Sequence, residues 1–156
     1  MVDSKVFIEQ VQKMERLLYR VGWTMLSNNE DCADAVQETL MKAWKNRDTL
    51  QNKRMFKTWL VRIMMNTCKD ILRRRQKNQT VPIDEENLPV SEPEVSAEEI
   101  GEAFEELSEE QRVIMLLRYR EGYKIREIAD MLSLPISTVT TRIQRSKAFL
   151  KRALTE

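Results

Sequence analysis

The sequence has 156 residues, of which 42% are hydrophobic and 33% charged, with three Gly and four Pro, and this composition predicts a soluble, mostly helical protein. The longest uninterrupted apolar run, residues 113–117, is too short to span a bilayer, and the N-terminus lacks a signal-peptide layout, so we expect a cytoplasmic protein. There is no His, and the only cysteines are Cys32 and Cys68. We therefore expect no metal site and no cofactor, we disfavour an enzyme, and we expect buried thiols rather than a disulfide.

The net charge of +1 conceals three segments of alternating sign. Residues 1–78 carry 16 Lys or Arg against 9 Asp or Glu, residues 79–111 carry 12 acidic and no basic residues, and residues 112–156 carry 10 basic against 4 acidic. Two basic segments around an acidic one predict two contacts with a polyanion such as nucleic acid. Basic faces that only keep helices in solution would give the same totals, so charge alone favours nucleic acid only somewhat.

The first half of the chain is predicted to form three helices. Residues 3–27 carry an apolar stripe at helical spacing, and "SNNED" ends this helix and offers Asn29 or Asp31 as the cap of a second helix, which runs to about Arg47. Residues 46–55, "NRDTLQNKRM", have no periodicity and predict mostly loop. A third helix follows over residues 56–76.

The third helix, "FKTWLVRIMMNTCKDILRRRQ", is predicted to have two faces of different character. The register of Phe56, Trp59 and Ile63 predicts one buried face, and it favours a core position for Trp59 about four to one over a role as a stacking residue. At about 100° per residue, a second face carries four polar side chains within roughly 60° of one another: Arg62, Asn66, Lys69 and Arg73. This stripe is either ordinary solvated surface or a binding face.

Residues 79–96 are predicted to be a flexible acidic linker. They contain three of the four prolines and no aromatic residue, so they cannot bury enough surface to fold alone. The boundary divides the chain into a domain at residues 1–78 and a second at residues 97–156. In the second domain, Ser108 and Gln111 have the spacing of a capping box, and Gly122 is placed to end the helix in the left-handed conformation.

Residues 123–154 predict a helix-turn-helix. A short helix is apolar at Ile125, Ile128, Ala129 and Leu132, and after the turn 133–135 a longer helix is apolar at positions that include Ile136, Val139 and Ile143. The opposite face of the second helix carries polar and basic residues that suit a major groove. A plain helical hairpin with a solvated cationic face is the alternative, and spacing alone favours DNA binding only about two to one.

Three segments, in this order, resemble a bacterial sigma factor of the extracytoplasmic-function type in the sigma-70 family. "DCADAVQETLMKAW" (31–44) resembles the family's core-binding helix, residues 56–76 its promoter-melting helix, and "LSEEQRVIMLLRYREGYKIREIADMLSLPISTVTTRIQRSKAFLKR" its domain that reads the −35 element. The resemblance implies an all-α fold: a region 2 helical bundle and a region 4 helix-turn-helix joined by the acidic, proline-containing linker. It also implies a promoter-specific transcription initiation factor in the bacterial cytoplasm.

The family's contacts can be placed on matching positions. Docking on the coiled coil of the largest polymerase subunit falls to four residues of the second helix, Asp34, Gln37, Glu38 and Met41. Periodicity agrees, because Val36, Leu40 and Trp44 would share the buried face and leave Gln37 and Glu38 exposed.

The loop "KNRDTLQNKRM" before the third helix occupies the place where the family captures a base flipped out of the −10 element. The residues implied for the −10 element and its single strand are Asn52, Lys53, Arg54, Arg62, Asn66, Lys69, Arg73 and Arg74. Asn66 matches an asparagine at the edge of the family's pocket, and the basic residues could hold phosphates of the separated strands.

The residues implied for the −35 element are Lys124, Arg126, Ser137, Thr138, Thr140, Thr141, Arg142, Gln144, Arg145 and Lys147. The sequence departs from the family's pattern at Ser133 and Ser137, where glycine is common, and at Thr140, where a basic residue is common. Thr141, Gln144 and Arg145 are therefore the better candidates for base contact, with Arg142 on phosphate.

The partners implied are core RNA polymerase, including the flap of its second subunit, promoter DNA, and a membrane-associated anti-sigma factor; the free chain is expected to be a monomer. A conventional helix-turn-helix regulator would leave residues 31–76 unexplained, and it usually needs a dimer. A helical adaptor without a nucleic-acid role is the second alternative. A nucleotide-utilising enzyme is a distant third, because the sequence has no glycine-rich phosphate loop.

Overall fold

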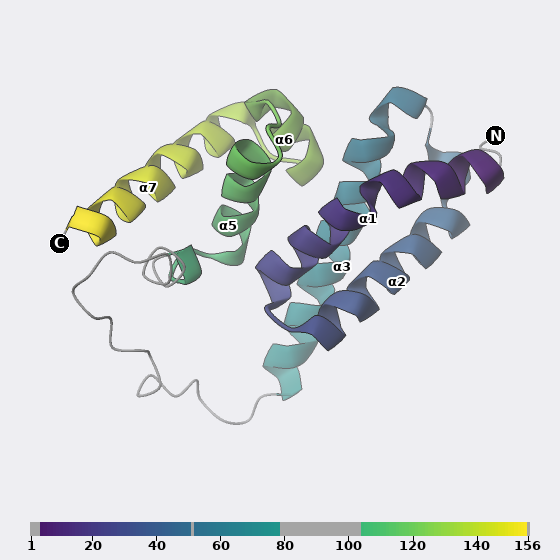
Figure 1. The fold of residues 1–156 in the computed structure, drawn as a ribbon, viewed down its shortest axis with the longest axis horizontal. Coiled ribbons are helices and arrows are strands. Elements are labelled where there is room, and N and C mark those ends of the chain that lie inside the picture. Colours follow the sequence, from purple (N-terminus) through teal and green to yellow (C-terminus); the bar gives the residue numbers. More distant parts are fainter. Residues whose placement is uncertain (1–3, 51, 79–103, 156) are drawn as a thin grey trace.

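The computed structural model describes residues 4–50, 52–78 and 104–155, and this part of the chain is helical without a strand (Figure 1). The elements, in chain order, are α1 (Ser4–Leu26), α2 (Asn29–Lys45), η1 (Arg47–Thr49), η2 (Lys53–Met55), α3 (Phe56–Asn78), α5 (Glu109–Met115), η4 (Leu116–Arg120), α6 (Ile125–Leu132) and α7 (Ile136–Thr155). The predicted all-α fold is confirmed. The linker predicted at 79–96 and the start of the second domain near residue 97 lie outside the described residues.

Helices α1, α2 and α3 pack along one another and bury the apolar stripes that the sequence predicts. Leu18, Val21, Leu60 and Met64 are fully buried at the centre of this bundle. The cap of α2 is Asn28 rather than Asn29 or Asp31: its side-chain oxygen accepts from the backbone N–H of Asp31 at 3.0 Å. The predicted helix bounds are otherwise correct to within a few residues.

Gly22 of α1 lies at a close approach between the three helices of this bundle. A Cβ at this position would lie 2.7 Å from Cys32 Sγ and 2.8 Å from Met64 Cε, so only glycine lets α1 come this near to α2 and α3. Cys32 and Cys68 are free and buried, as predicted. Burial, reinforced by the neighbouring Cys32, raises the pKa of the Cys68 thiol to about 12, so this thiol stays protonated and packs as a small apolar group.

The second group of helices begins with the predicted capping box. Ser108 Oγ accepts from the Gln111 backbone N–H at 3.2 Å, and Gln111 Oε1 accepts from the Ser108 N–H at 3.1 Å. Helix α5 continues into η4, a π-helical turn, and Gly122 follows with φ of 75°, the left-handed conformation predicted for it. The chain then enters α6.

Helices α6 and α7 form the predicted helix-turn-helix. Ser133 ends α6 with φ of 56°, so the position where the family commonly has glycine is a left-handed one occupied by serine. Val139 and Ile143 are buried as predicted, but Ile136 is half exposed, because the first residue of α7 has helix on only one side of it.

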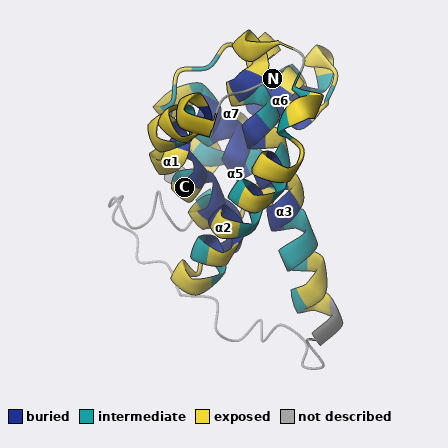
Figure 2. Cartoon of the chain, turned by 90° about the vertical axis from the view of Figure 1, so that its right-hand side faces the viewer, coloured by how far each residue is buried: buried dark blue, intermediate teal, exposed yellow. Residues whose placement is uncertain are grey.

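The two groups of helices pack against each other, which the sequence did not predict. Helix α1 contacts α5, helix α3 contacts α6, and the buried residues of both groups form one hydrophobic core (Figure 2). Arg20 Nε of α1 donates to Glu121 Oε1 at 2.6 Å across this contact. A hollow of about 340 Å³ remains beside it, lined by residues of both groups that include Thr24 and Leu116.

Candidate nucleic-acid interface

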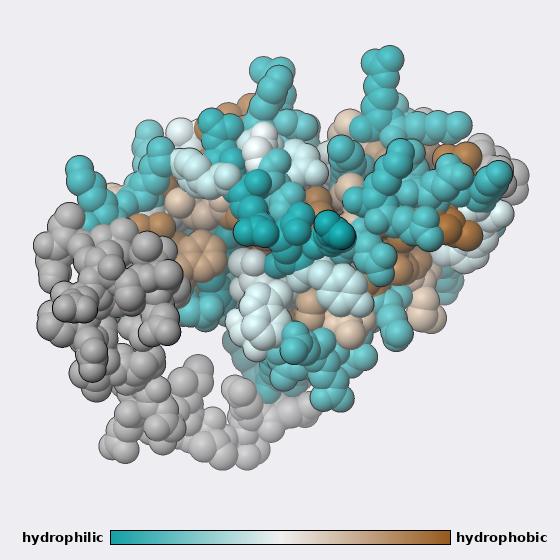
Figure 3. Space-filling model, viewed as in Figure 1, coloured by the Kyte–Doolittle hydropathy of each residue, from teal (hydrophilic) through white to brown (hydrophobic). Residues whose placement is uncertain are grey.

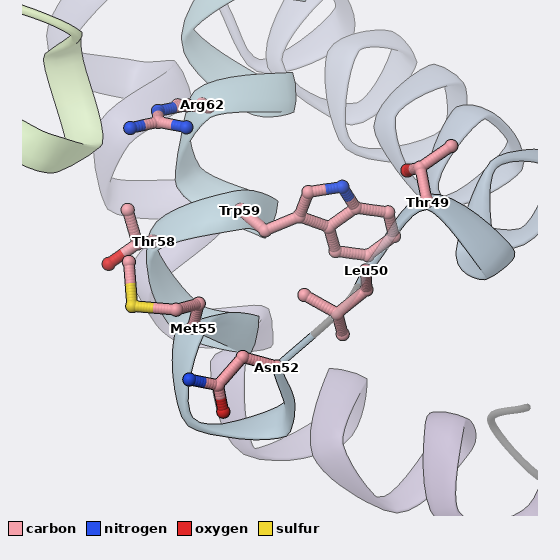
Figure 4. A pocket seen from close by; sticks show the side chains of 7 residues that line it. All are labelled: Thr49, Leu50, Asn52, Met55, Thr58, Trp59 and Arg62. Atoms are coloured by element: carbon pink, nitrogen blue, oxygen red, sulfur yellow. The ribbon is translucent and has the colours of Figure 1, made fainter.

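The segment between α2 and α3 and the first two turns of α3 enclose an open pocket of about 270 Å³ (Figure 4). The residues that line it are Thr49, Leu50, Asn52, Met55, Thr58, Trp59 and Arg62. The pocket therefore forms at the place where the family resemblance puts the captured base. Of its residues, Asn52 and Arg62 were predicted as site residues. The loop's lack of periodicity gave no signal for Thr49, Leu50 or Met55, and Thr58 of α3 was not singled out either.

Two short helical turns hold the wall of the pocket in place, where the sequence predicted mostly irregular loop. In η1, Thr49 Oγ1 donates to the Asn46 carbonyl oxygen at 2.7 Å. In η2, Asn52 Oδ1 accepts from the Arg54 backbone N–H at 3.0 Å, so Asn52 caps this turn. These side-chain-to-backbone bonds let a segment with little apolar content keep a defined shape.

The prediction that Trp59 is a core residue is correct for only one side of its ring. Trp59 packs against the core and lies 5.8 Å, centroid to centroid, from Phe56. It is nevertheless only half-buried, and the rest of the indole lines the pocket. Periodicity locates the buried face of a helix but not a hollow at the edge of that face. The sequence therefore could not show that Trp59 both packs in the core and lines a pocket.

The polar stripe on α3 is divided between the pocket and open surface. Arg62 lines the pocket, and its Nε donates to the backbone carbonyl oxygen of Asp130 in α6 at 2.7 Å. Asn66 lies about one turn further along α3, is exposed, and is not among the described lining residues. Its implied place at the pocket edge stays a prediction.

The basic end of α3 is tied to α2 by ion pairs. Arg75 Nε donates to Asp31 Oδ2 at 2.8 Å, so it acts as a structural tie. Arg74 lies 3.6 Å from Glu38 of α2, whereas Arg73 pairs with Asp70 of α3 itself at 3.2 Å. Arg73 and Arg74 stay mostly exposed, with 71% and 62% of their side-chain surface accessible, so both keep a face open to a phosphate.

The residues implied for polymerase docking share one side of α2. Asp34, Gln37 and Met41 are exposed, and Met41 is 73% accessible, which is unusual for an apolar side chain. Glu38 is half-buried and pairs with Lys42 at 3.5 Å.

The prediction that Trp44 lies on the buried face of α2 is wrong. Trp44 is 39% exposed: its ring packs edge-on against Phe7 at 5.2 Å, and the Arg47 guanidinium covers it at 4.0 Å. The apolar period of α2 reaches the end of the bundle at this point, so the ring is covered on one side only.

The predicted −35 residues gather on the outer side of the helix-turn-helix. Those exposed are Lys124, Arg126, Ser137, Thr141, Gln144, Arg145 and Lys147, and those half-buried are Thr138, Thr140 and Arg142. Three of them have internal partners that the sequence did not reveal. Lys147 Nζ lies 5.2 Å from the centroid of the Tyr119 ring. Arg142 forms an ion pair with Glu110 of α5, and Thr140 Oγ1 donates to the Ile136 carbonyl oxygen at 3.0 Å.

Much of the surface seen in Figure 3 is hydrophilic. No helix among the described residues is long and apolar enough to cross a membrane.

Comparison with known proteins decides the family. The Sigma-70 region 2 profile matches residues 10–78, and the Sigma-70, region 4 profile matches residues 97–150. The chain is 30% identical to RNA polymerase sigma factor SigV of Bacillus subtilis over 142 residues, which are 88% of this chain and 84% of SigV. The chain belongs to the extracytoplasmic-function sigma factors of the sigma-70 family. The predicted family is confirmed.

Other relatives agree with this assignment. The sigma factor is 33% identical to the extracytoplasmic-function sigma-E factor of Salmonella typhimurium over 174 residues, covering 94% of this chain and 91% of that protein. Among solved structures, the sigma factor RpoE of Bartonella quintana, in complex with the anti-sigma factor NepR, matches with a TM-score of 0.76 and 24% identity over 97% of this chain and 98% of that one. CnrH, in complex with the cytosolic domain of CnrY, matches with a TM-score of 0.74 and 23% identity over 98% and 90%. These two likenesses show the fold.

Family membership also settles the class of activity. Sigma factors are transcription initiation factors rather than enzymes, and they direct RNA polymerase to promoters. The region 2 profile covers most of α1 and all of α2 and α3 with the pocket, and the region 4 profile covers α6 and most of α7.

Proposed function

We propose that this sigma factor positions polymerase by reading a −35 element with α6 and α7 and a −10 element with α3, and that it holds melted −10 DNA by taking one flipped base into the pocket beside Trp59. The pocket is the observation that carries the proposal. It lies on the polar side of α3, between the family's melting helix and the loop before it.

The pocket has the parts that an extruded base needs. Trp59 presents part of an aromatic ring, Leu50 and Met55 supply apolar wall, and Asn52 supplies hydrogen-bonding groups to the base edge. Extruding a base costs a few kcal/mol, and stacking on an aromatic ring returns about 1–3 kcal/mol per base. Capture can therefore offset most of the cost of unpairing without any covalent step.

Exposed basic residues beside the pocket and at the far end of α3 could bind phosphates of the strand that carries the captured base. Lys53 and Arg54 lie on η2, and Arg73 and Arg74 lie at the far end of α3. A strand that follows α3 would pass Asn66 and half-buried Lys69 between these two basic ends. This arrangement supports contacts along the single strand rather than at one point.

In the second half of the molecule, α7 supplies the groove-facing helix. Thr141, Gln144 and Arg145 are exposed on one side of it and carry groups that read base edges, while Lys124 and Arg126 on α6 can reach the backbone. Arg142 forms an ion pair with Glu110. We therefore assign Arg142 to holding α7 in position rather than to binding a phosphate.

Docking on core polymerase is assigned to Asp34, Gln37, Glu38 and Met41 on the exposed side of α2. An anti-sigma partner is inferred from the solved complexes of the neighbouring folds with NepR and CnrY. With these partners, the sigma factor would act in the cytoplasm.

Run-off transcription with purified core polymerase tests the proposal. We expect Trp59→Ala to reduce open-complex formation, followed by permanganate reactivity of the melted strand, at least tenfold while polymerase binding is retained. Trp23→Ala is the matched control, because Trp23 is 49% exposed on α1 and does not line the pocket. Unchanged open-complex formation by a Trp59→Ala protein that keeps its melting temperature would contradict the proposed role.

Two further variants separate docking from melting. Gln37→Ala combined with Glu38→Ala should weaken polymerase binding more than melting, and Asn66→Ala should do the reverse. Failure of the wild-type protein to start transcription from any genomic template would refute the proposal as a whole.

A further inference from the structure

Met41 on α2 is the most exposed sulfur-containing residue in the part of the chain that the structure describes. It is 73% accessible, whereas Met55, the next most open methionine there, is 38% accessible. The other described methionines are all buried: Met14, Met25, Met64, Met65, Met115 and Met131. An oxidant in solution therefore reaches the thioether of Met41 far more readily than the thioethers of the core.

The two cysteines do not compete with Met41 for such an oxidant. Cys32 and Cys68 are both buried. Burial raises the pKa of the Cys32 thiol, and burial together with the nearby Cys32 raises the pKa of the Cys68 thiol to about 12. Both thiols therefore stay protonated near neutral pH, and the protonated thiol reacts poorly with peroxides because the thiolate is the nucleophile.

The position of Met41 on α2 gives its oxidation a consequence. Asp34 and Gln37 lie two turns and one turn earlier on the same side of the helix, and both are exposed. Trp44, three positions after Met41, is 39% exposed. Met41 and Trp44 thus form the apolar end of a mainly polar helix face, and a partner that covers this face would remove the thioether from water.

Resting on the proposed docking of core polymerase on α2, we propose that Met41 is a modification site, at which a peroxide converts the thioether to a sulfoxide and so weakens polymerase binding. The sulfur lone pair attacks one oxygen of hydrogen peroxide, an S–O bond forms, and the O–O bond breaks. The other oxygen takes up the proton of the attacked hydroxyl and leaves as water. The methionine loses two electrons, the peroxide gains them, and a methionine sulfoxide reductase can reverse the change.

The sulfoxide weakens docking because its oxygen is a hydrogen-bond acceptor on a side chain that the interface would bury. A thioether loses little when it leaves water, whereas a buried acceptor without a donor loses its bonds to water. We expect the oxidised protein to bind core polymerase about tenfold more weakly. The same contact should cover Met41 in the holoenzyme and slow its oxidation.

The first experiment exposes the free sigma factor and the holoenzyme to the same series of hydrogen peroxide concentrations and measures oxidation at each methionine by peptide mass spectrometry. In the free protein, Met41 should be oxidised before the buried Met64. In the holoenzyme, oxidation of Met41 should be several-fold slower. Oxidation of Met41 no faster than that of Met64 in the free protein would overturn the inference.

The second experiment measures polymerase affinity after peroxide has been removed, with core polymerase that was never oxidised. The affinity of the wild-type protein should fall about tenfold and should return after treatment with methionine sulfoxide reductase. Met41→Leu has no sulfur at this position, so its affinity should be the same before and after peroxide. Met55→Leu is the matched control: it removes the next most exposed described methionine and should keep the full effect of peroxide.

The outcomes separate this inference from the function on which it rests. If the holoenzyme protects Met41 but the sulfoxide form binds polymerase as tightly as the thioether form, docking on α2 stands and control by oxidation is overturned. An equal loss of affinity in peroxide-treated Met41→Leu would place the damage elsewhere and overturn it as well. If Met41 is oxidised equally fast in the free protein and in the holoenzyme, polymerase does not cover this residue, and the proposed docking at Met41 is itself refuted.

Discussion

Arg62 of the pocket donates its Nε hydrogen to the backbone carbonyl of Asp130, 68 residues later in the chain, at 2.7 Å. The residue that lines the proposed −10 pocket is thus held by the first helix of the helix-turn-helix. Together with the pair Arg20–Glu121, it fixes α1 to η4 and α3 to α6. The two proposed DNA-reading surfaces therefore belong to one packed body.

We expect the two groups of helices to separate when both ties are removed. Arg20→Ala with Arg62→Ala should increase the radius of gyration in small-angle X-ray scattering, because each tie contributes only about 1 kcal/mol and the remaining contact must hold alone. Arg16→Ala with Lys57→Ala is the control, since it removes the same charges from exposed positions of α1 and α3. An unchanged radius in the double variant would show that apolar packing suffices.

Promoter binding should open the same contact. Elements at −35 and −10 are separated by about 25 base pairs, or roughly 85 Å at 3.4 Å per base pair, which is farther than two packed helical groups of this size extend. Fluorophores on α2 and α7 should therefore move apart when holoenzyme binds a promoter. An unchanged efficiency of resonance energy transfer between the two fluorophores after promoter addition would contradict this expectation.

Gly22→Ala should destabilise the protein by about 1–3 kcal/mol, although alanine normally stabilises a helix relative to glycine. The added Cβ would lie 2.7 Å from Cys32 Sγ, which is fixed between α1 and α2. Cys32→Ala removes the sulfur, so the double variant should be more stable than the sum of the two single changes predicts. If the changes in the free energy of unfolding, measured in urea, are additive, the contact of the new Cβ with Cys32 Sγ is not the cause of the destabilisation.

Ser133→Gly should stabilise the protein by up to about 1 kcal/mol, because Ser133 has φ of 56° and glycine adopts this conformation without strain. Ser137→Gly, within α7, gives the matched comparison and should destabilise by about 0.5–1 kcal/mol through lower helix propensity. Thermal unfolding of the two variants should therefore shift in opposite directions. Shifts of the same sign would argue against a left-handed Ser133.

Glu110→Ala should lower stability by up to about 1 kcal/mol and weaken −35 binding only through the position of α7, because Glu110 pairs with the half-exposed Arg142. Arg145→Ala should leave stability unchanged and reduce −35 affinity. The two measurements are urea unfolding and a footprint of holoenzyme on promoter DNA. A loss of stability in Arg145→Ala equal to that in Glu110→Ala would contradict the assignment of Arg145 to DNA contact alone.

The site was only partly predictable. Asn52 and Arg62 were placed by family resemblance, and both line the pocket, but Trp59 was predicted as core and Trp44 as buried. Both tryptophans lie where a buried face meets an edge of the bundle. Periodicity reports an angle around a helix axis, whereas exposure at an edge depends on where the neighbouring helix ends.

The sequence by itself determined the helices, the capping box at Ser108, the left-handed Gly122, the helix-turn-helix and the family, because these depend on residues a few positions apart. Tertiary structure alone decided the shape of the pocket, the partner of Arg142 and the packing of α1 on α5 and α3 on α6. The contacts involved join residues as far apart as Arg20 and Glu121, separated by 101 positions. Local physical chemistry sets which faces are apolar or charged, but the three-dimensional fold selects which of those faces meet.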